Sequence, residues 1–230
     1  MVVMSSDQVI LALDVDSAQE ALQWAKRLHG KVGTFKVGLQ LYLRAGSEVM
    51  TGLHKLNAPV FLDLKFHDIP NTVGKAVAAA SVWRPRFLTV HTSGGSEMME
   101  AAASSAPEGT QVLGVTILTS LDGASVAEVG WANGIPAAVD RLSALARKAG
   151  LGGVVCSPHE AAQERAAWGP LAEIVTPGVR PPGAKQNDQA RSKTASEAIA
   201  AGASRIVIGR PVLNAADPEG ALEFILEGKS

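Results

Sequence analysis

The chain of 230 residues has one cysteine, one tyrosine and only 4% aromatic residues. A single cysteine excludes an intrachain disulfide and is typical of a reducing compartment. No block of like charge occurs and the formal net charge is −1, so neither nucleic acid nor an anionic membrane surface is indicated as a partner. No apolar run reaches the roughly 18 residues of a membrane span, and no signal peptide is visible. These features predict a soluble, cytoplasmic protein.

The composition also limits the kinds of site that we expect. Hydrophobic residues make up 47% of the chain, which is enough for a sizeable core. Cys156 lies in the apolar run 152–156, and we expect a small core residue there rather than a nucleophile. No set of His, Cys, Asp and Glu has zinc-site spacing, so we predict no metal and no cofactor.

Short apolar runs recur along the chain, and a segment with helical spacing follows each of them. The runs cover residues 9–13, 34–37, 59–62, 87–90, 111–118, 153–156, 173–175 and 205–208. Their Val, Ile, Leu and Phe content is typical of parallel strands covered on both faces. Eight such units without a linker predict an α/β fold, a single-domain (β/α)8 TIM barrel over residues 1–230. A doubly wound open sheet is the alternative, but residues 13–17 are not the glycine-rich phosphate loop of such folds.

Several helix boundaries carry local signals. Ser17 and Glu20 have the spacing of a capping box, in which each side chain bonds the backbone of the other. Pro70 suits the first position of a helix, where its missing N–H costs nothing. Gly202 is expected to end a helix over residues 195–201.

Polar residues follow nearly every predicted strand. Since a barrel builds its active site at the carboxyl ends of its strands, we expect them to converge on one mouth. They are Asp14, Lys36, Asp63, Lys65, His91, Thr119, Ser120, Gly178, Arg180, Gly209 and Arg210. Each has a structural alternative: Lys36 could be a surface lysine and His91 a core histidine that holds strand ends together. The convergence favours a catalytic site.

The stretch 61–72 is the most informative part of the sequence. Alternation along a strand directs Asp63 and Lys65 to the same face, and burying such charges is costly unless they are paired. Asp68 follows on the loop before the next predicted helix. An isolated Asp-x-Lys-x-x-Asp could also be a surface ion pair. The rest of the chain has to distinguish that alternative from a catalytic cluster.

The ends of the seventh and eighth predicted strands have the features of a phosphate site. Gly178 and Gly209 would let backbone N–H groups approach an anion, and Arg180 and Arg210 offer forked donors. The Pro/Gly-rich segment 181–190, which contains Gln189, is typical of a mobile lid that grips a phosphate. An ordinary surface loop is the alternative.

Together these residues resemble the bacterial branch of the orotidine 5′-phosphate decarboxylase family, from about Val9 to Val212. The motifs that carry the resemblance are residues 11–14, 36–38, 63–72, 90–95, 118–120, 176–180, 188–189 and 208–210. The full motif 63–72 is highly specific. The chain departs from the family pattern in residues 184–187 and at Ser47, where a proline is expected.

The resemblance implies cofactor-independent decarboxylation of orotidine 5′-monophosphate (OMP) to UMP, the last step of de novo pyrimidine nucleotide synthesis. The implied catalytic residues are Lys36, Asp63, Lys65 and, from the second subunit of a homodimer, Asp68, with Lys65 as the proton donor to C6. The implied substrate-binding residues are Asp14, Lys36, Asp63, Asp68, Ile69, Thr72, Thr119, Pro177, Arg180, Gln189, Gly209 and Arg210.

Within that set, Asp14 and Lys36 would bind the ribose and Thr119 the pyrimidine edge. Asp68 and Thr72 would reach across the dimer interface. The phosphate would be held by Arg180, Gln189, Gly209 and Arg210. Two alternatives remain, namely a magnesium-dependent sugar-phosphate lyase of the same barrel superfamily and a non-catalytic nucleotide-binding barrel.

Overall fold

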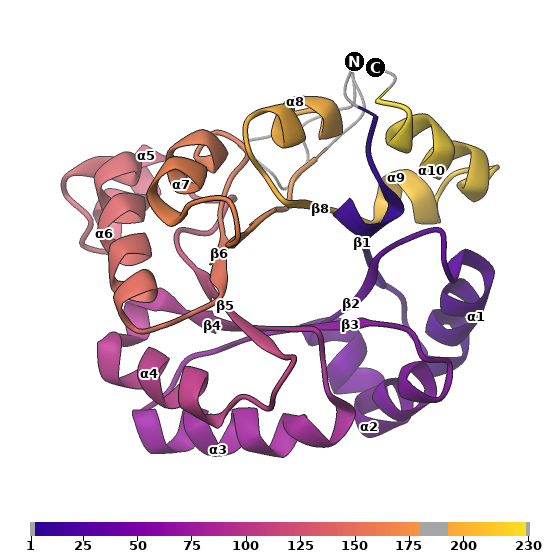
Figure 1. The fold of residues 1–230 in the computed structure, drawn as a ribbon, viewed down its shortest axis with the longest axis horizontal. Helices are drawn as coiled ribbons and strands as arrows, with labels where there is room; N and C mark the ends of the chain where they lie inside the picture. Colours follow the sequence, from indigo (N-terminus) through magenta and orange to yellow (C-terminus); the bar gives the residue numbers. More distant parts are fainter. Residues whose placement is uncertain (1–2, 180–192, 229–230) are drawn as a thin grey trace.

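The computed structural model describes residues 3–179 and 193–228, and eight parallel strands form a closed barrel at its centre (Figure 1). The strands are β1 (Val9–Ala12), β2 (Thr34–Gly38), β3 (Val60–Phe66), β4 (Phe87–His91), β5 (Gln111–Val115), β6 (Gly153–Val155), β7 (Glu173–Thr176) and β8 (Arg205–Ile208). Each strand pairs with the next in sequence, and β8 pairs with β1 to close the barrel. The predicted TIM barrel is confirmed, and the open-sheet alternative is wrong.

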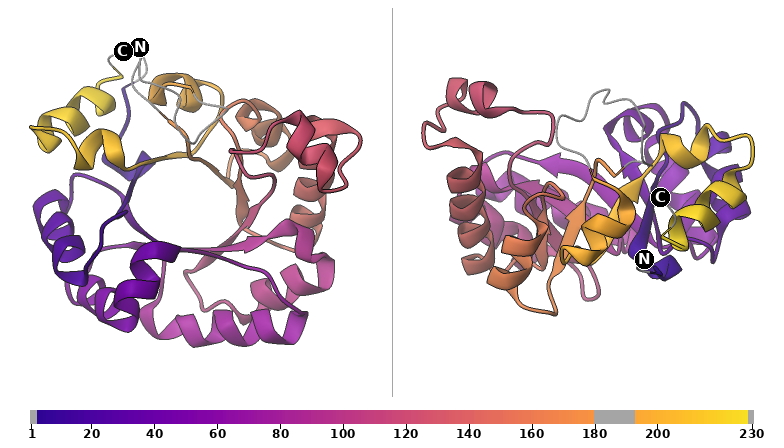
Figure 2. Two further views of the ribbon diagram at one scale, coloured as in Figure 1. Left: turned by 180° about the vertical axis from the view of Figure 1, so that it is seen from behind. Right: turned by 90° about the horizontal axis from the view of Figure 1, so that it is seen from above.

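Helices form an outer layer around the barrel, as the views from both ends and from the side show (Figures 1 and 2). They are α1 (Ala18–Leu28), α2 (Leu39–Lys55), α3 (Pro70–Ala80), α4 (Ser96–Ser105), α5 (Gly123–Glu128), α6 (Gly134–Lys148), α7 (Ala161–Trp168), α8 (Ala195–Ala200), α9 (Arg210–Leu213) and α10 (Pro218–Leu226). Short 3₁₀ turns η1 (Ser6–Gln8), η2 (Ser81–Trp83) and η3 (Thr92–Gly94) complete the elements. No helix in residues 3–179 and 193–228 is long and apolar enough to cross a membrane.

The local signals at helix ends act largely as expected. The Ser17 hydroxyl accepts a hydrogen bond from the Glu20 backbone N–H, 3.2 Å away, at the start of α1. Pro70 is the first residue of α3. Helix α8 stops just before Gly202, which has a φ of 107°, a conformation that glycine adopts without steric cost.

Two predicted strand ends differ from the structure. The run that ends at Leu118 in the sequence leaves the sheet at Val115, because Ile117 packs against the neighbourhood of α5 and α6 rather than extending the strand. The strand expected to stop at Leu62 continues to Phe66. This extension brings Asp63 and Lys65 into β3 itself.

The core has three parts: one inside the barrel, one between the barrel and the helices, and a small one around Ile117 at α5 and α6. The inner part is small and apolar, and Phe61 and Phe87 meet there edge to face at 5.9 Å between ring centroids. The outer part is larger and includes the buried faces of the helices. Strand residues therefore alternate between two apolar surroundings, as expected for a barrel covered on its outside.

A charged cluster closes the amino-terminal end of the barrel. Arg205, at the start of β8, makes two 3.1 Å contacts with the Glu173 carboxylate and one of 2.9 Å with Asp7. Its guanidinium also lies 5.2 Å from the ring centroid of Phe87. Hydrogen bonding from Arg86, opposed by partial burial and assisted by Arg205, lowers the pKa of Asp7 to about 2. Polar groups at this end of a barrel indicate a role in stability.

Strand β3 carries a bulge beside β4. The ladder pairs Leu62 with Leu88 and Phe66 with Val90, so residues 63–65 of β3 lie opposite Thr89 alone. Lys65 takes a left-handed backbone conformation with a φ of 52°. Bulges occur preferentially at barrel rims and beside active sites, where they redirect a side chain.

Candidate active site

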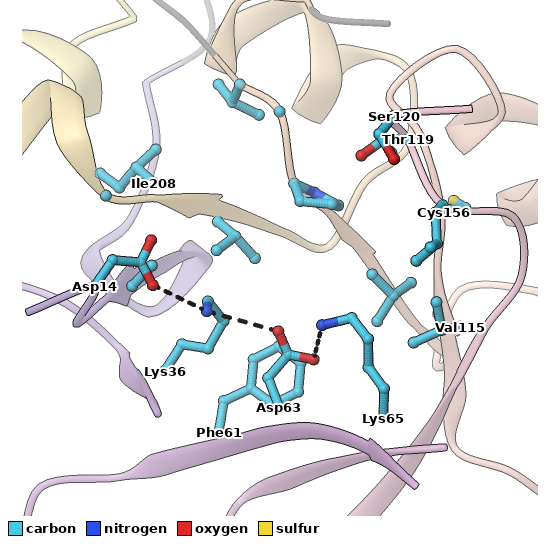
Figure 3. A pocket seen from close by; sticks show the side chains of 18 of the residues that line it. Asp14, Lys36, Phe61, Asp63, Lys65, Val115, Thr119, Ser120, Cys156 and Ile208 are labelled. Carbon is cyan, nitrogen blue, oxygen red and sulfur yellow. Dashed lines mark hydrogen bonds and ion pairs between the residues drawn. The ribbon is translucent and has the colours of Figure 1, made fainter. Parts of the chain in front are cut away.

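A cavity of about 440 Å³ opens at the carboxyl ends of the strands. Its volume lies within the range of small-molecule sites. Side chains from the barrel interior, including Phe61 and Val155, form apolar walls, and charged residues from β1 to β3 line one side (Figure 3). Most of the polar residues predicted to converge on one mouth line this cavity, whereas His91 does not.

Four charged side chains form a row of alternating sign along that side of the cavity (Figure 3). Lys36 Nζ lies 3.5 Å from Asp14 Oδ1 and 3.6 Å from Asp63 Oδ2. Lys65 Nζ then lies 2.8 Å from the other oxygen of Asp63. The carboxylate of Asp63 thus bridges two ammonium groups, and Lys36 lines the cavity rather than the protein surface.

Asp63 is buried, with 9% of the residue exposed, yet it remains a carboxylate. Burial alone would raise its pKa, but the charges of Lys36 and Lys65 and hydrogen bonds from Lys65 and Thr89 outweigh burial. The net effect is a pKa below the usual range of aspartate. A stable carboxylate at this position keeps both ammonium groups oriented.

Close packing of the backbone helps to place the row. A Cβ on Gly38 would come within 3.0 Å of Lys36 Nζ, so a larger residue there would press on the ammonium. A Cβ on Gly209 would lie 3.4 Å from Asp14 Oδ2 and 3.3 Å from the Cβ of Ala12. Both glycines leave room at the ends of β2 and β8 for charged groups or a ligand.

Thr89 is a site residue that the sequence reasoning did not find. It is fully buried on β4, where its hydroxyl donates to Asp63 Oδ1 at 3.0 Å. The Thr89 hydroxyl oxygen itself accepts a hydrogen bond from the backbone N–H of Lys65, also at 3.0 Å. A β-branched residue in an apolar strand is ordinary, so no local signal distinguishes it from a packing residue.

His91 stands at the end of β4 but does not line the cavity. Its ring is half-buried and lies 5.4 Å from the ring of His67, centroid to centroid. Burial, followed by the charges of His67 and Lys65, lowers the pKa of His91, while Asp63 opposes the shift. A neutral, packed imidazole is typical of a core histidine that holds strand ends together rather than of a catalytic residue.

The predicted contacts to the base and phosphate fall in two groups. Thr119, Pro177, Gly209 and Arg210 line the cavity, as do Ser120 and Gly178. Thr119 and Ser120 stand across the cavity from the charged row (Figure 3). Arg180 and Gln189 lie outside the described residues.

Asp68, Ile69 and Thr72 do not line this cavity. All three are exposed on the loop after β3 and the first turn of α3, and 65% of Ile69 is accessible. Asp68 Oδ1 accepts a hydrogen bond from the Ile69 backbone N–H at 2.6 Å. Within one chain, therefore, these predicted substrate contacts stand apart from the charged row.

Two further expectations concern the chemistry of the donor atoms. Cys156 is buried, as predicted, with its residue at the cavity wall. Within residues 3–179 and 193–228, no group of three or more His, Cys, Asp or Glu side chains is arranged to hold a metal ion.

A closed barrel with alternating Asp and Lys side chains in a cavity at its carboxyl mouth is typical of a TIM-barrel enzyme. Residues 7–225 match the orotidine 5′-phosphate decarboxylase / HUMPS family. The chain belongs to this family.

Individual relatives agree with this assignment. The chain is 49% identical to the orotidine 5′-phosphate decarboxylase of Anaeromyxobacter dehalogenans over 97% of this chain and 98% of the relative. The protein of the same name from Thermobifida fusca is 48% identical over 93% and 91% of the two chains. The crystal structure of orotidine 5′-phosphate decarboxylase from Lactobacillus acidophilus is similar with a TM-score of 0.82 and 35% identity, covering 94% of this chain and 96% of that one.

Proposed function

We propose that this protein decarboxylates OMP to UMP without a cofactor, in pyrimidine nucleotide synthesis. The observation that carries the proposal is the alternating charged row at the cavity wall, in which Asp63 joins Lys36 and Lys65. The family membership and the names of the relatives support the same reaction. A binding module would have no need for alternating charges beside an uncharged ring edge.

The chemistry explains why such a row is useful. Loss of CO2 from C6 of the orotate ring breaks the carbon–carbon bond and leaves the electron pair in the ring plane, where no adjacent π-system delocalises it. A fixed ammonium beside C6 would stabilise the developing carbanion and then transfer a proton to it. Lys65 is the candidate, since its Nζ is held 2.8 Å from Asp63 and faces the cavity.

The remaining residues would bind the parts of the nucleotide that do not react. Asp14 and Lys36 would hydrogen-bond the ribose hydroxyls, and Thr119 would meet the pyrimidine edge. The phosphate would be held by Arg180, Gln189, Gly209 and Arg210, which follow β7 and β8 in the sequence. Binding energy from the phosphate would drive closure and desolvation around the reacting carbon.

The direct test is the loss of OMP absorbance with purified protein in the presence of EDTA. Chelator-resistant conversion to UMP and CO2 is expected. Turnover that needs added Mg²⁺, or that occurs only with a sugar phosphate, would favour the magnesium-dependent lyase alternative. Tight UMP binding without any turnover would favour the non-catalytic barrel.

We further propose a homodimer in which Asp68 and Thr72 of each subunit complete the site of the other. Support comes from their exposure outside the cavity of their own chain. Two apolar residues at the starts of α2 and α3 are exposed as well, with Leu39 53% and Ile69 65% accessible. Such residues would be covered in a dimer.

The dimer proposal predicts complementation between two inactive variants. Mixing Lys65→Ala with Asp68→Ala protein should restore part of the activity, because some heterodimers then carry one site with both residues intact. Each variant incubated alone under the same exchange conditions is the control. No recovery, despite subunit exchange shown by mass spectrometry of labelled chains, would contradict the shared site.

Residues 1–230 are proposed to form one catalytic domain, since the barrel uses strands from the whole described chain. A cytoplasmic location is proposed as well. The single cysteine, which is typical of a reducing compartment, supports it.

A further inference from the structure

The bulge in β3 leaves Thr89 as the one β4 residue opposite residues 63–65. In a regular strand the N–H of Lys65 would face β2, because the carbonyl of Pro59, six residues earlier, faces β2 and accepts from the backbone N–H of Phe35. Here the Thr89 hydroxyl on β4 accepts it instead, at 3.0 Å. The bulge therefore turns the N–H of Lys65 toward β4, where the side chain of Thr89 supplies the acceptor.

The same hydroxyl also holds the central carboxylate of the charged row. Its proton is donated to Asp63 Oδ1 at 3.0 Å, and this oxygen is the one that contacts Lys65 Nζ at 2.8 Å. A hydroxyl can donate one hydrogen bond and accept others at the same time. Thr89 thus contacts both ends of Lys65. It binds the peptide N–H directly, and it reaches the ammonium through the carboxylate of Asp63.

We propose that Thr89 is a positioning residue for decarboxylation, whose hydroxyl fixes the left-handed peptide of Lys65 and the carboxylate of Asp63 so that the ammonium stays at the reacting carbon. The inference rests on the proposed function of the site. It assigns Thr89 no contact with substrate.

The backbone of Lys65 makes this support necessary. A φ of 52° is sterically unfavourable for a residue with a long side chain, so surrounding contacts must maintain it. Without the hydroxyl, the N–H of Lys65 loses its acceptor and the peptide can relax toward ordinary strand geometry. Such a shift would move the ammonium, and small displacements of a reacting group cost large factors in rate.

The test compares Thr89→Val, which keeps the shape but removes the hydroxyl, with Thr89→Ser, which keeps the hydroxyl. Thr34→Val is the matched control, because Thr34 is also fully buried in a barrel strand and its hydroxyl makes no hydrogen bond with the described residues. OMP turnover and UMP affinity are measured for all three variants and the wild type.

We expect kcat of Thr89→Val to fall by about 10- to 100-fold, the range for one lost hydrogen bond to a charged group. The Kd for UMP should change by less than about threefold, since ground-state binding does not use the hydroxyl. Thr89→Ser should stay within about threefold of the wild-type kcat, and Thr34→Val should match the wild type.

A pH profile gives a second readout that a purely structural role would not move. Asp63 is faced by Lys36 from β2, Lys65 from β3, and Thr89 and His91 from β4, with Asp14 beyond Lys36. Because the hydrogen bond from Thr89 helps to lower the pKa of Asp63, its removal should shift the acid limb of kcat to higher pH. Thr89→Ser should keep the wild-type limb.

The outcomes separate this inference from the proposed function. If the wild type fails to convert OMP, the proposed function is wrong and the inference falls with it. If the wild type is active and Thr89→Val has the same kcat and pH profile, the inference alone is overturned. Should Thr89→Val not fold, Thr89→Cys offers a weaker hydrogen-bonding group of similar size, and equal kcat for the Cys and Ser variants would also overturn it.

Discussion

Replacing Lys65 with alanine removes two contributions to the proposed reaction at once. A unit positive charge about 4 Å from the developing carbanion is worth about 4 kcal/mol at an effective dielectric constant of 20, or roughly a factor of 10³ in rate. Proton transfer from a positioned group adds about 10²–10⁴. The side chain of Lys65 faces the cavity and is held by Asp63, so we expect both contributions to apply. The predicted loss in kcat is therefore about 10⁵- to 10⁷-fold.

The assay must resolve such a loss without confusing it with misfolding or lost binding. OMP conversion is followed by absorbance over hours at high protein concentration, and UMP affinity is measured by calorimetry. Lys75→Ala, which changes an exposed lysine of α3, serves as the control and should behave as the wild type. A folded Lys65→Ala protein whose kcat falls by less than about 10² would refute the assignment of Lys65 as both charge and proton donor.

Two further predictions concern stability at the amino-terminal end of the barrel. Arg205→Met removes the buried partner of Glu173, whose side chain is only 13% exposed, and should cost about 3–5 kcal/mol. Tm should fall by roughly 6–20 °C in a melting experiment. Arg27→Met at the exposed pair with Glu219 should shift Tm by less than about 4 °C, and equal shifts would contradict the role of burial. Because the folded pKa of Asp7 is about 2, against an ordinary 3.8, its stabilising effect is complete above about pH 4 and is lost as pH falls toward 2. The advantage of the wild type over Asp7→Asn in denaturant melts should therefore shrink between about pH 4 and pH 2, and a constant difference would count against this linkage.

The barrel could be predicted because its signals are local and repeated. Each strand is a short apolar run followed by a helix, and the number and order of these units match the structure. The carboxyl ends of parallel strands must meet at one rim, so Asp14, Lys36 and Thr119 could be assigned to one mouth without coordinates. In these positions, topology converts sequence order directly into proximity.

Other features depend on contacts that sequence order does not specify. Arg205 and Glu173 lie on different strands, and their bidentate pairing follows from the register between β7 and β8. Thr89 is a similar case, because a buried threonine in a strand is consistent with simple packing. Its role depends on a bulge in the neighbouring strand, and the sequence of β3 has no glycine that would mark one.

Asp63 and Lys65 lie together as expected, but the cause is a bulge in β3 and not the regular alternation of a strand. Alternation along a regular strand predicts that both side chains share a face, and they do meet at 2.8 Å. Yet Lys65 is left-handed, and the ladder shifts between Leu62 and Phe66, so regular alternation does not account for the contact. A regular strand would direct both side chains to the inside of the barrel, the face of Phe61, whereas the bulge turns the backbone at Lys65. The left-handed conformation of Lys65 costs about 1–3 kcal/mol. The contacts of Lys65 with Asp63 and Thr89 must offset this cost, so the charged row and the backbone of β3 depend on the same contacts.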